Sequence, residues 1–184
     1  MVRGKDMKLI SKRLYLRELT EVDAPILLEG TRDQELRYMT GTKLNFTLEQ
    51  IKAHIQHINH DESRYDFAIC LKENDQMIGE LSILDIDQEN KKAGFRIALN
   101  SMALTGQGYG TEAIKVILPF VFEELQLNRL QLEVFDHNLR GITAYEKVGF
   151  VKEGVLRDSL NFEGKYADEI IMALLKKDYT QLTY

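Results

Sequence analysis

The chain has 184 residues, of which 44% are hydrophobic and 29% charged, and its formal net charge is −5 at pH 7. These values are those of an ordinary one-domain globular protein, and they exclude disordered, collagen-like and low-complexity chains. The acidic balance also argues against nucleic acid as a direct partner, because nucleic-acid binders normally present a basic face.

The first part of the chain contains one strand and two helix starts. Alternation over Arg13–Glu18 predicts a half-buried strand. The spacing of Thr20 and Asp23 resembles a capping box and predicts a helix over residues 20–29, and Thr47 with Gln50 begins a second helix. An isoleucine stripe at positions i, i+4 and i+7 of this second helix should face the core.

Strands dominate the middle of the chain. Asp66–Lys72 and Met77–Ile86 are apolar and flank a turn-like segment, which predicts a hairpin, and Ala93–Leu99 predicts a further strand. A glycine cluster follows, and then a helix over about residues 111–125 with one apolar face. Pro119 should weaken or kink that helix, because proline lacks the backbone N–H.

The last part alternates strands with one short helix. Leu130–Phe135 predicts a strand, Asn138–Val148 a helix that Gly149 ends, and Phe150–Leu156 and Glu169–Leu175 two late strands. The whole order, β-α-α-β-β-β-α-β-α-β-β, predicts a mixed sheet with helices packed on it. The expected fold class is therefore α+β, or mixed α/β, in a single domain over residues 1–184.

Several kinds of site and location are not indicated. The longest apolar run, Val116–Phe122, is far shorter than the roughly 20 residues of a membrane span, and Met1–Lys8 does not resemble a secretory leader. Cys70 is the only cysteine, which excludes a disulfide framework and a multi-cysteine metal site. We therefore expect a cytoplasmic protein with no membrane partner.

Three histidines recur at intervals of three residues, which raises the question of a metal site. On a helix they would run round its flank, away from the isoleucine stripe, with no obvious carboxylate partner. We expect a polar helix face and no metal. The three residues are His54, His57 and His60.

The strongest local signal is Gly106-Gln107-Gly108-Tyr109-Gly110, between a predicted strand and a predicted helix. Alternate glycines let several backbone N–H groups converge, and the helix that follows adds its unpaired N–H groups and a partial positive charge. That arrangement suits a phosphate or pyrophosphate. A flexible surface loop is the alternative, and neither the Rossmann nor the P-loop pattern fits.

A second signal lies on the short helix. Asn138 can cap its N-terminus, and Tyr145 follows two turns later on the same face. A tyrosine at that position either packs in the core or places its hydroxyl in a site. His137, just before the cap, belongs either to a surface loop or to a cleft.

Together these segments resemble the GNAT superfamily of N-acetyltransferases, whose central motif is Arg/Gln-x-x-Gly-x-Gly/Ala between a strand and a helix. Here the motif reads Thr105–Ala113, and the next motif is matched by the strand Asn128–Val134, by Asn138 and by Tyr145–Phe150. Arg13–Glu18 and Gly154–Arg157 are similar to the branch of ribosomal-protein alanine and spermidine acetyltransferases. The resemblance covers roughly residues 8–179, which we take as the domain core.

The resemblance implies a central, mostly antiparallel, twisted sheet flanked by helices, and direct acetyl transfer from acetyl-CoA to a primary amine. The acceptor would be a protein N-terminus, a polyamine or another small amine, and a homodimer is left open. By the same resemblance Asn138 contacts the pantetheine arm, and an oxyanion donor lies near Ala98 or Leu99. The implied cofactor-binding residues are Ala98, Leu99, Thr105, Gly106, Gln107, Gly108, Tyr109, Gly110, Thr111, Asn138 and Tyr145.

The resemblance also assigns Tyr145 as the acid that protonates the departing thiolate. No general base stands out: Glu80 and Glu133 lie in strands that could border the cleft, and a water chain or no base at all are alternatives. Thr105 stands where the family has Arg or Gln. A CoA-binding sensor without activity and an unrelated phosphate-binding domain are the rival interpretations.

Overall fold

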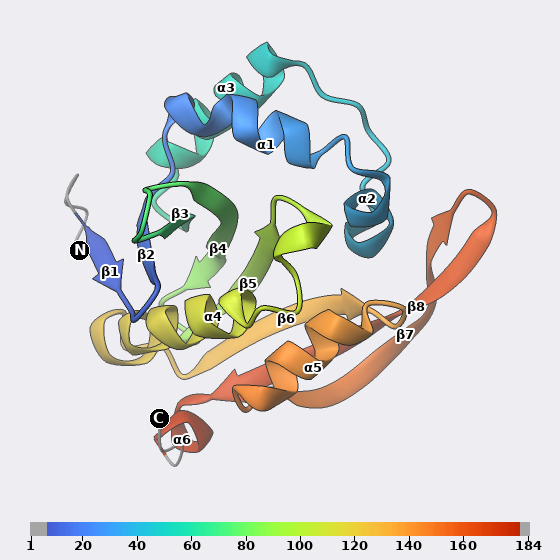
Figure 1. The fold of residues 1–184 in the computed structure, drawn as a ribbon. Helices are drawn as coiled ribbons and strands as arrows, with labels where there is room; N and C mark the ends of the chain where they lie inside the picture. Colours follow the sequence, from blue (N-terminus) through green and yellow to red (C-terminus); the bar gives the residue numbers. More distant parts are fainter. Residues whose placement is uncertain (1–6, 181–184) are drawn as a thin grey trace.

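Eight strands form one mixed sheet with helices on both faces in the computed structural model, which describes residues 7–180 (Figure 1). Met1–Asp6, which belong to the segment where no leader is expected, and residues 181–184 lie outside the described residues. The strands are β1 (Lys8–Ile10), β2 (Leu14–Glu18), β3 (Tyr65–Leu71), β4 (Met77–Asp87), β5 (Lys92–Leu99), β6 (Arg129–Phe135), β7 (Val151–Phe162) and β8 (Lys165–Leu175). The α-helices are α1 (Ala24–Gly30), α2 (Gln34–Thr40), α3 (Leu48–His60), α4 (Tyr109–Pro119), α5 (Leu139–Lys147) and α6 (Lys176–Tyr179).

The strand order is β1-β2-β3-β4-β5-β6-β8-β7. Neighbouring strands run antiparallel except β5 and β6, which are parallel. The mixed, mostly antiparallel sheet that the sequence predicts is thereby confirmed. A parallel neighbour requires a crossover, and α4 supplies it between β5 and β6.

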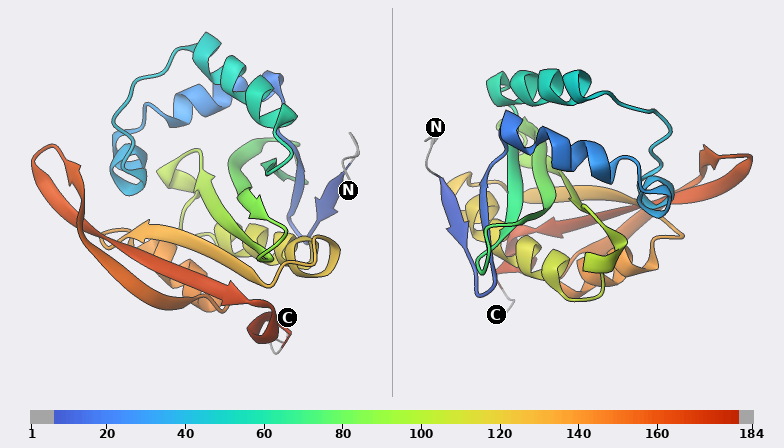
Figure 2. Two further views of the ribbon diagram at one scale, coloured as in Figure 1. Left: turned by 180° about the vertical axis from the view of Figure 1, so that it is seen from behind. Right: turned by 45° about the horizontal axis from the view of Figure 1, so that its top comes forward.

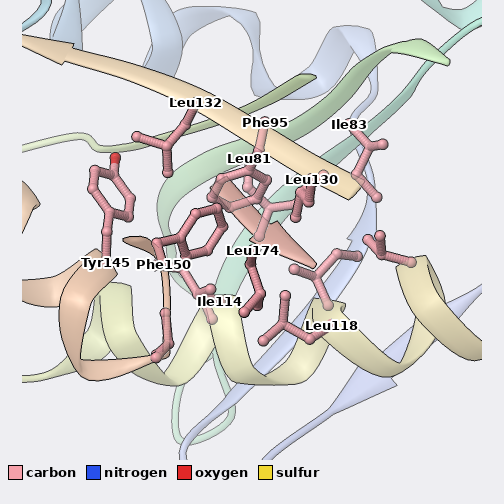
Figure 3. Packing of buried hydrophobic residues seen from close by; sticks show 14 of the residues in the cluster. Leu81, Ile83, Phe95, Ile114, Leu118, Leu130, Leu132, Tyr145, Phe150 and Leu174 are labelled. Atoms are coloured by element: carbon pink, nitrogen blue, oxygen red, sulfur yellow. The ribbon is translucent and has the colours of Figure 1, made fainter. Parts of the chain in front are cut away.

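The helices form two layers. α1 and α3 lie over the face of β2 and β3, and α4 and α5 lie on the opposite face (Figure 2). The predicted stripe of Ile51, Ile55 and Ile58 is buried under α3. On the other face, side chains from α4, α5 and the sheet make the larger core, which includes Ile114, Leu130 and Leu174 (Figure 3).

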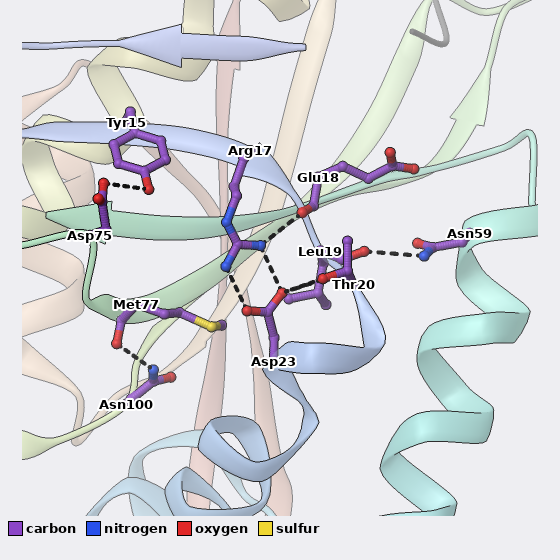
Figure 4. A network of polar contacts seen from close by, with 10 residues as sticks. All are labelled: Tyr15, Arg17, Glu18, Leu19, Thr20, Asp23, Asn59, Asp75, Met77 and Asn100. Atoms are coloured by element: carbon purple, nitrogen blue, oxygen red, sulfur yellow. Dashed lines mark hydrogen bonds and ion pairs between the residues drawn. The ribbon is translucent and has the colours of Figure 1, made fainter. Parts of the chain in front are cut away.

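An ion pair fixes α1 against the sheet. Both terminal nitrogens of Arg17 on β2 donate to the two carboxylate oxygens of Asp23, at 2.8 and 2.6 Å (Figure 4). Asp23 also accepts from the N–H of Thr20 at 2.9 Å, as the predicted cap requires. Burial alone would raise the pKa of Asp23, but the bonds from Arg17 and Thr20 outweigh burial and lower it.

The predicted helix over residues 111–125 is divided in the structure. The α-helix begins at Tyr109 and ends at Pro119, and a π-helical turn covers Phe120–Glu124. Pro119 has no N–H for the carbonyl four residues earlier, so the α-helical ladder stops there. The wider turn then closes with a bond from the Leu125 N–H to the Phe120 carbonyl at 2.9 Å.

The structure adds elements that the pattern did not predict and lengthens others. β1 and α6 are too short to show a period, and α2 buries none of its side chains fully. The late strands are longer than predicted, and their turn contains Glu163 at φ 51° and Gly164 at φ 83°. β7 has no visible alternation because nearly all of its side chains are exposed.

Candidate active site

β5 and β6 separate from one another on the way to their carboxyl ends. They pair only from Lys92–Gly94 to Arg129–Gln131, and both continue for several residues beyond. The other side of β5 is bonded to β4, where the Asn100 N–H donates to the Ile78 carbonyl at 2.8 Å. Backbone groups alternate sides along a strand. The N–H groups of Ile97 and Leu99 therefore point toward the gap beside β6.

The glycine loop follows the end of β5. Gly106 and Gly108 have φ of 75° and 80°, which glycine adopts without strain. The backbone N–H groups from Gly106 to Thr111 donate to no acceptor among residues 7–180. They surround the N-terminus of α4, so free donors and the positive end of a helix coincide. This is a cradle for an anion such as a pyrophosphate.

A cavity of about 660 Å³ joins the gap and the loop. Its wall contains the tip of β5, the glycine loop, the first turns of α4 and α5, and side chains of α2. Of the residues predicted from the sequence, ten lie in this wall: Ala98, Leu99, Thr105, Gly106, Gly108, Tyr109, Gly110, Thr111, Asn138 and Tyr145.

Tyr145 contributes a phenol to the cavity wall from the last part of α5. Its ring packs edge-on against Phe150 at 5.9 Å, only 8% of the residue is exposed, and its hydroxyl points away from Phe150 (Figure 3). Burial alone accounts for the pKa of this hydroxyl, with no contribution from a hydrogen bond. Burial raises the pKa of Tyr145 to about 12, so the group keeps its proton at neutral pH and can donate it.

Asn138 is the N-cap of α5, as its sequence position predicts. Its Oδ1 accepts from the Gly141 N–H at 3.0 Å. A side chain at position 141 would collide with the Asn138 amide, since a Cβ there would lie 2.8 Å from Nδ2. The cap therefore fixes the orientation of an amide in the cavity wall.

Thr105 connects the glycine loop to α5. Its hydroxyl donates to the Met102 carbonyl at 2.7 Å and accepts from Nη1 of Arg140 at 3.1 Å. Arg140 also lies in the cavity wall. A cationic side chain thus reaches the loop from another element, although position 105 itself carries only a hydroxyl.

Three other predicted residues lie outside the cavity wall. The Gln107 side chain donates to the Ala103 carbonyl at 2.8 Å, and Glu133 is exposed beside Gln131. Glu80 on β4 lies directly across from Ala98, and its carboxylate is 3.8 Å from Arg96. Burial is the main influence on Glu80 and raises its pKa.

His137 is a site residue that its sequence position left undecided. Its side chain is 14% exposed, lies in the cavity wall and stacks on Tyr38 of α2 at 4.0 Å. Nε2 is 2.9 Å from the Tyr38 carbonyl, and the buried Nδ1 has no hydrogen-bond partner but lies 3.6 Å from Asp136. His137 thus holds α2 against the end of β6, and its position directly after a strand and before a helix cap was the available signal.

Two kinds of feature are missing from residues 7–180. No three His, Cys, Asp or Glu side chains are placed to share a metal ion, and His54, His57 and His60 make no such group. No helix in the same range is long and apolar enough to cross a membrane.

Known proteins resemble the chain over most of its length. A family model described as an acetyltransferase (GNAT) domain matches residues 13–151. An uncharacterized N-acetyltransferase, p20, of Bacillus licheniformis is 33% identical over 177 residues, covering 93% of this chain and 97% of that protein. The spermidine N(1)-acetyltransferase of Escherichia coli K12 is 28% identical, covering 78% and 75%. The crystal structure of spermidine N-acetyltransferase from Vibrio cholerae with CoA and spermine has a TM-score of 0.85 at 22% identity, covering 93% of this chain and 100% of that chain.

Proposed function

From the premise that the chain belongs to the GNAT family of acetyltransferases, we propose that the cavity between β5, β6 and the glycine loop is its active site. As a member of that family the protein is an acetyl-CoA-dependent N-acetyltransferase, which transfers the acetyl group directly to a primary amine. The observation that carries the proposal is the coincidence of free loop N–H groups and an unpaired strand edge in one cavity.

We assign the donor side of the reaction as follows. The N–H groups of Gly106 to Thr111 bind the pyrophosphate of acetyl-CoA, and Arg140 adds a positive charge beside them. The free edge of β5 hydrogen-bonds an extended pantetheine chain as a neighbouring strand would. The Asn138 amide borders the same path. Acetyl-CoA supplies an activated thioester.

The transfer then requires donors for a developing oxyanion and a departing thiolate. The N–H of Leu99 points into the gap and can bind the carbonyl oxygen as negative charge develops on it. Tyr145 is protonated at neutral pH, and we assign it as the acid that delivers a proton to the thiolate as the C–S bond breaks.

The attacking amine must be neutral, which is a larger demand for a Lys-like amine with pKa about 10.4 than for an α-amine near 8. Glu80 is our first candidate for the base, through water, because it lies across the strand pair from Ala98 of the cavity wall. Glu133 is the second candidate, although it is exposed and hydrogen-bonded to Gln131.

We propose a cationic primary amine as the acceptor, with polyamines tested first. Two kinds of observation support this choice: similar proteins are named for spermidine, and the chain is acidic overall, with Glu35 of α2 in the cavity wall. An acidic surface raises the local concentration of a cation and its rate of encounter. A protein N-terminus is the alternative, since another relative is named a ribosomal N-acetyltransferase.

Release of free CoA thiol is the direct test. The purified protein is incubated with acetyl-CoA and, separately, spermidine, an N-terminal peptide and a set of small amines, with an amine-free reaction as the control. We expect amine-dependent thiol release and a stoichiometric acetylated product. Tight CoA binding with no turnover on any amine would favour the inactive sensor, and no CoA binding would remove the proposed site.

We also propose a homodimer in the cytoplasm, without nucleic acid as a direct partner. β7 is the last strand of the sheet, so its outer edge is unpaired, and Val151 and Leu156 on it are 58% and 47% exposed. The single cysteine, Cys70, is buried and free, as is usual in a reducing compartment. Sedimentation at two protein concentrations tests the dimer, and a single species of monomer mass would exclude it.

A further inference from the structure

The segment between β1 and β2 contacts the glycine loop through one arginine. Nη1 of Arg13 donates to the Gln107 carbonyl at 3.0 Å, and its Nε donates to Oε2 of Glu112 at 2.7 Å. The Arg13 backbone N–H reaches Oε1 of the same carboxylate, also at 2.7 Å. The guanidinium lies over the ring of Tyr109, 4.5 Å from its centroid. One side chain therefore touches the loop, the first residue of α4 and the first turn of that helix.

The bond to Gln107 fixes the direction of a peptide group. In a trans peptide the C=O and the following N–H point in opposite directions. Because the Gln107 carbonyl is turned to Arg13, the N–H of Gly108 is turned away from Arg13. Gly108 is in the cavity wall and has φ of 80°. Its own carbonyl accepts from the Glu112 N–H at 3.0 Å, so α4 holds one side of Gly108 and Arg13 holds the peptide before it.

The bond to Glu112 removes an electrostatic obstacle. A carboxylate in the first turn of α4 lies close to where an anion would bind and would repel it. Glu112 accepts three hydrogen bonds in all: the two from Arg13 and one from the Ser11 hydroxyl at 2.7 Å. Burial alone would raise the pKa of Glu112, but these bonds outweigh burial and lower it, so the group is ionised and its charge is met by Arg13.

We infer that Arg13 is a positioning residue for the pyrophosphate of acetyl-CoA: it aims the Gly108 N–H into the cavity and neutralises Glu112. The inference rests on the proposed function, since it assumes that the glycine loop binds the donor. Arg13 itself is 42% exposed and on the outer side of the loop. It acts through the loop and the helix and takes no part in the transfer step.

The test distinguishes an effect on pyrophosphate binding from an effect on binding of the rest of the donor. Arg13→Met, Arg13→Lys and the neighbouring control Lys12→Met are compared with the wild type by calorimetry with CoA. KM and kcat are then measured with acetyl-CoA and with S-acetylpantetheine, which lacks pyrophosphate and nucleotide, using an amine that the wild type acetylates. Lys12 is exposed and carries the same charge one residue away.

We expect Arg13→Met to weaken CoA binding and to raise KM for acetyl-CoA by about tenfold or more, with kcat within about twofold. Kinetics with S-acetylpantetheine should be unchanged, and Lys12→Met should behave as wild type. Arg13→Lys should show most of the same loss of CoA affinity, because an ammonium lacks the planar guanidinium that bonds Gln107 and Glu112 at the same time. Thermal stability should hardly change, because an exposed ion pair contributes little to it.

Three results would overturn the inference: unchanged CoA affinity in Arg13→Met, equal losses with both donors, or full recovery in Arg13→Lys. If Arg13→Met does not fold, Arg13→Lys provides the test. Weak CoA binding by Arg13→Lys supports the inference, and CoA binding equal to that of the wild type overturns it. A wild-type protein that binds no CoA would instead refute the proposed function. The two failures are therefore distinguishable.

Discussion

Tyr145 is a residue whose pKa is changed by burial alone. Burial raises its pKa from 10 to about 12, so the phenol is protonated over the whole physiological range but is a weaker acid than an exposed tyrosine. Tyr145 belongs both to the cavity wall and to the hydrophobic core. Replacement by Phe removes one oxygen and preserves the packing.

We expect Tyr145→Phe to lower kcat by about tenfold to a hundredfold, at or below the lower end of the usual range for general acids, because a thiolate leaves tolerably well unaided. CoA affinity should stay near that of the wild type. The ratio of the two kcat values should remain constant between about pH 6 and 9, since the wild-type phenol does not titrate there. An unchanged kcat at every pH would make Tyr145 a packing residue only.

Replacing Glu80 should have opposite effects on stability and on activity. Its folded pKa is raised, mainly by burial, so the folded state binds the proton more tightly than the unfolded state does. The stability that this proton confers is complete below the unfolded pKa of about 4.3 and is lost as pH rises through the folded pKa. At neutral pH the buried carboxylate is therefore a cost.

Glu80→Gln should accordingly raise Tm at neutral pH and leave it unchanged near pH 4, while thiol release falls about a hundredfold if Glu80 is the base. Each kcal/mol corresponds to ~2–4 °C in a chain of this size. Calorimetry at two pH values and the thiol assay check both parts. A lower Tm at neutral pH would mean that the pairing with Arg96, at 3.8 Å, outweighs burial. Unchanged activity would exclude Glu80 as base.

The residues of the site differ in how far the sequence could place them. Asn138 caps α5 and Tyr145 lies on it, at a spacing that the sequence shows, and both residues are in the cavity wall. The contact of Arg13 with Glu112 joins positions 99 residues apart, and no period or motif links them. Tertiary pairing of this kind follows from the order of strands, which local pattern does not determine.

α2 forms part of the cavity wall. It is a seven-residue helix capped by Asp33, whose side chain accepts from the Leu36 N–H at 2.9 Å, and ended by Gly41. It contributes Glu35, Leu36, Met39 and Thr40 to the cavity wall. No stripe of buried side chains marks it, so apolar periodicity does not predict it, although its two caps are readable.

Gly41 ends α2 and lies close to the ring of Phe135. Its φ is 67°, and a Cβ there would lie 2.8 Å from the ring of Phe135 on β6. Gly41→Ala should therefore displace α2 and lower the free energy of unfolding by about 1–3 kcal/mol. KM for the amine should rise more than KM for acetyl-CoA, because the proposed donor contacts are made by the glycine loop and α5 and not by α2.

Gly164→Ala is the matched control for that prediction. Gly164 has a similar φ of 83°, but nothing lies within 4 Å of a Cβ built there. An alanine at position 164 would have the same backbone strain, but its Cβ would contact no neighbour and the substitution would not affect α2. We expect a smaller loss of stability and unchanged KM values. Equal effects of the two substitutions on KM would show that α2 does not shape the amine site.

At the scale of the molecule, the sheet consists of two parts that share little backbone bonding. β5 and β6 pair over three residues, and beyond them the sheet is open. The core beneath bridges the two parts, because side chains of α4 and α5 pack with both in one cluster. The gap between β5 and β6, and the core that connects the two parts of the sheet, both follow from the parallel crossover. The local sequence pattern predicts the strands but not the residue at which their pairing ends.

A donor bound in this gap should therefore stabilise the whole molecule, and we propose that residues 1–184, with a core at about 8–179, unfold as a single domain. Saturation at a hundredfold excess over Kd contributes about 2.7 kcal/mol, which for a chain of this size is roughly 5–10 °C in Tm. Calorimetry with increasing acetyl-CoA should show one transition that moves as a unit, and fluorescence and circular dichroism should give the same midpoint. Pantetheine, which lacks the pyrophosphate, should produce a much smaller shift at equal concentration. Two transitions of which acetyl-CoA moves only one would show that the parts on either side of the gap fold independently, and that the core under α4 does not couple them.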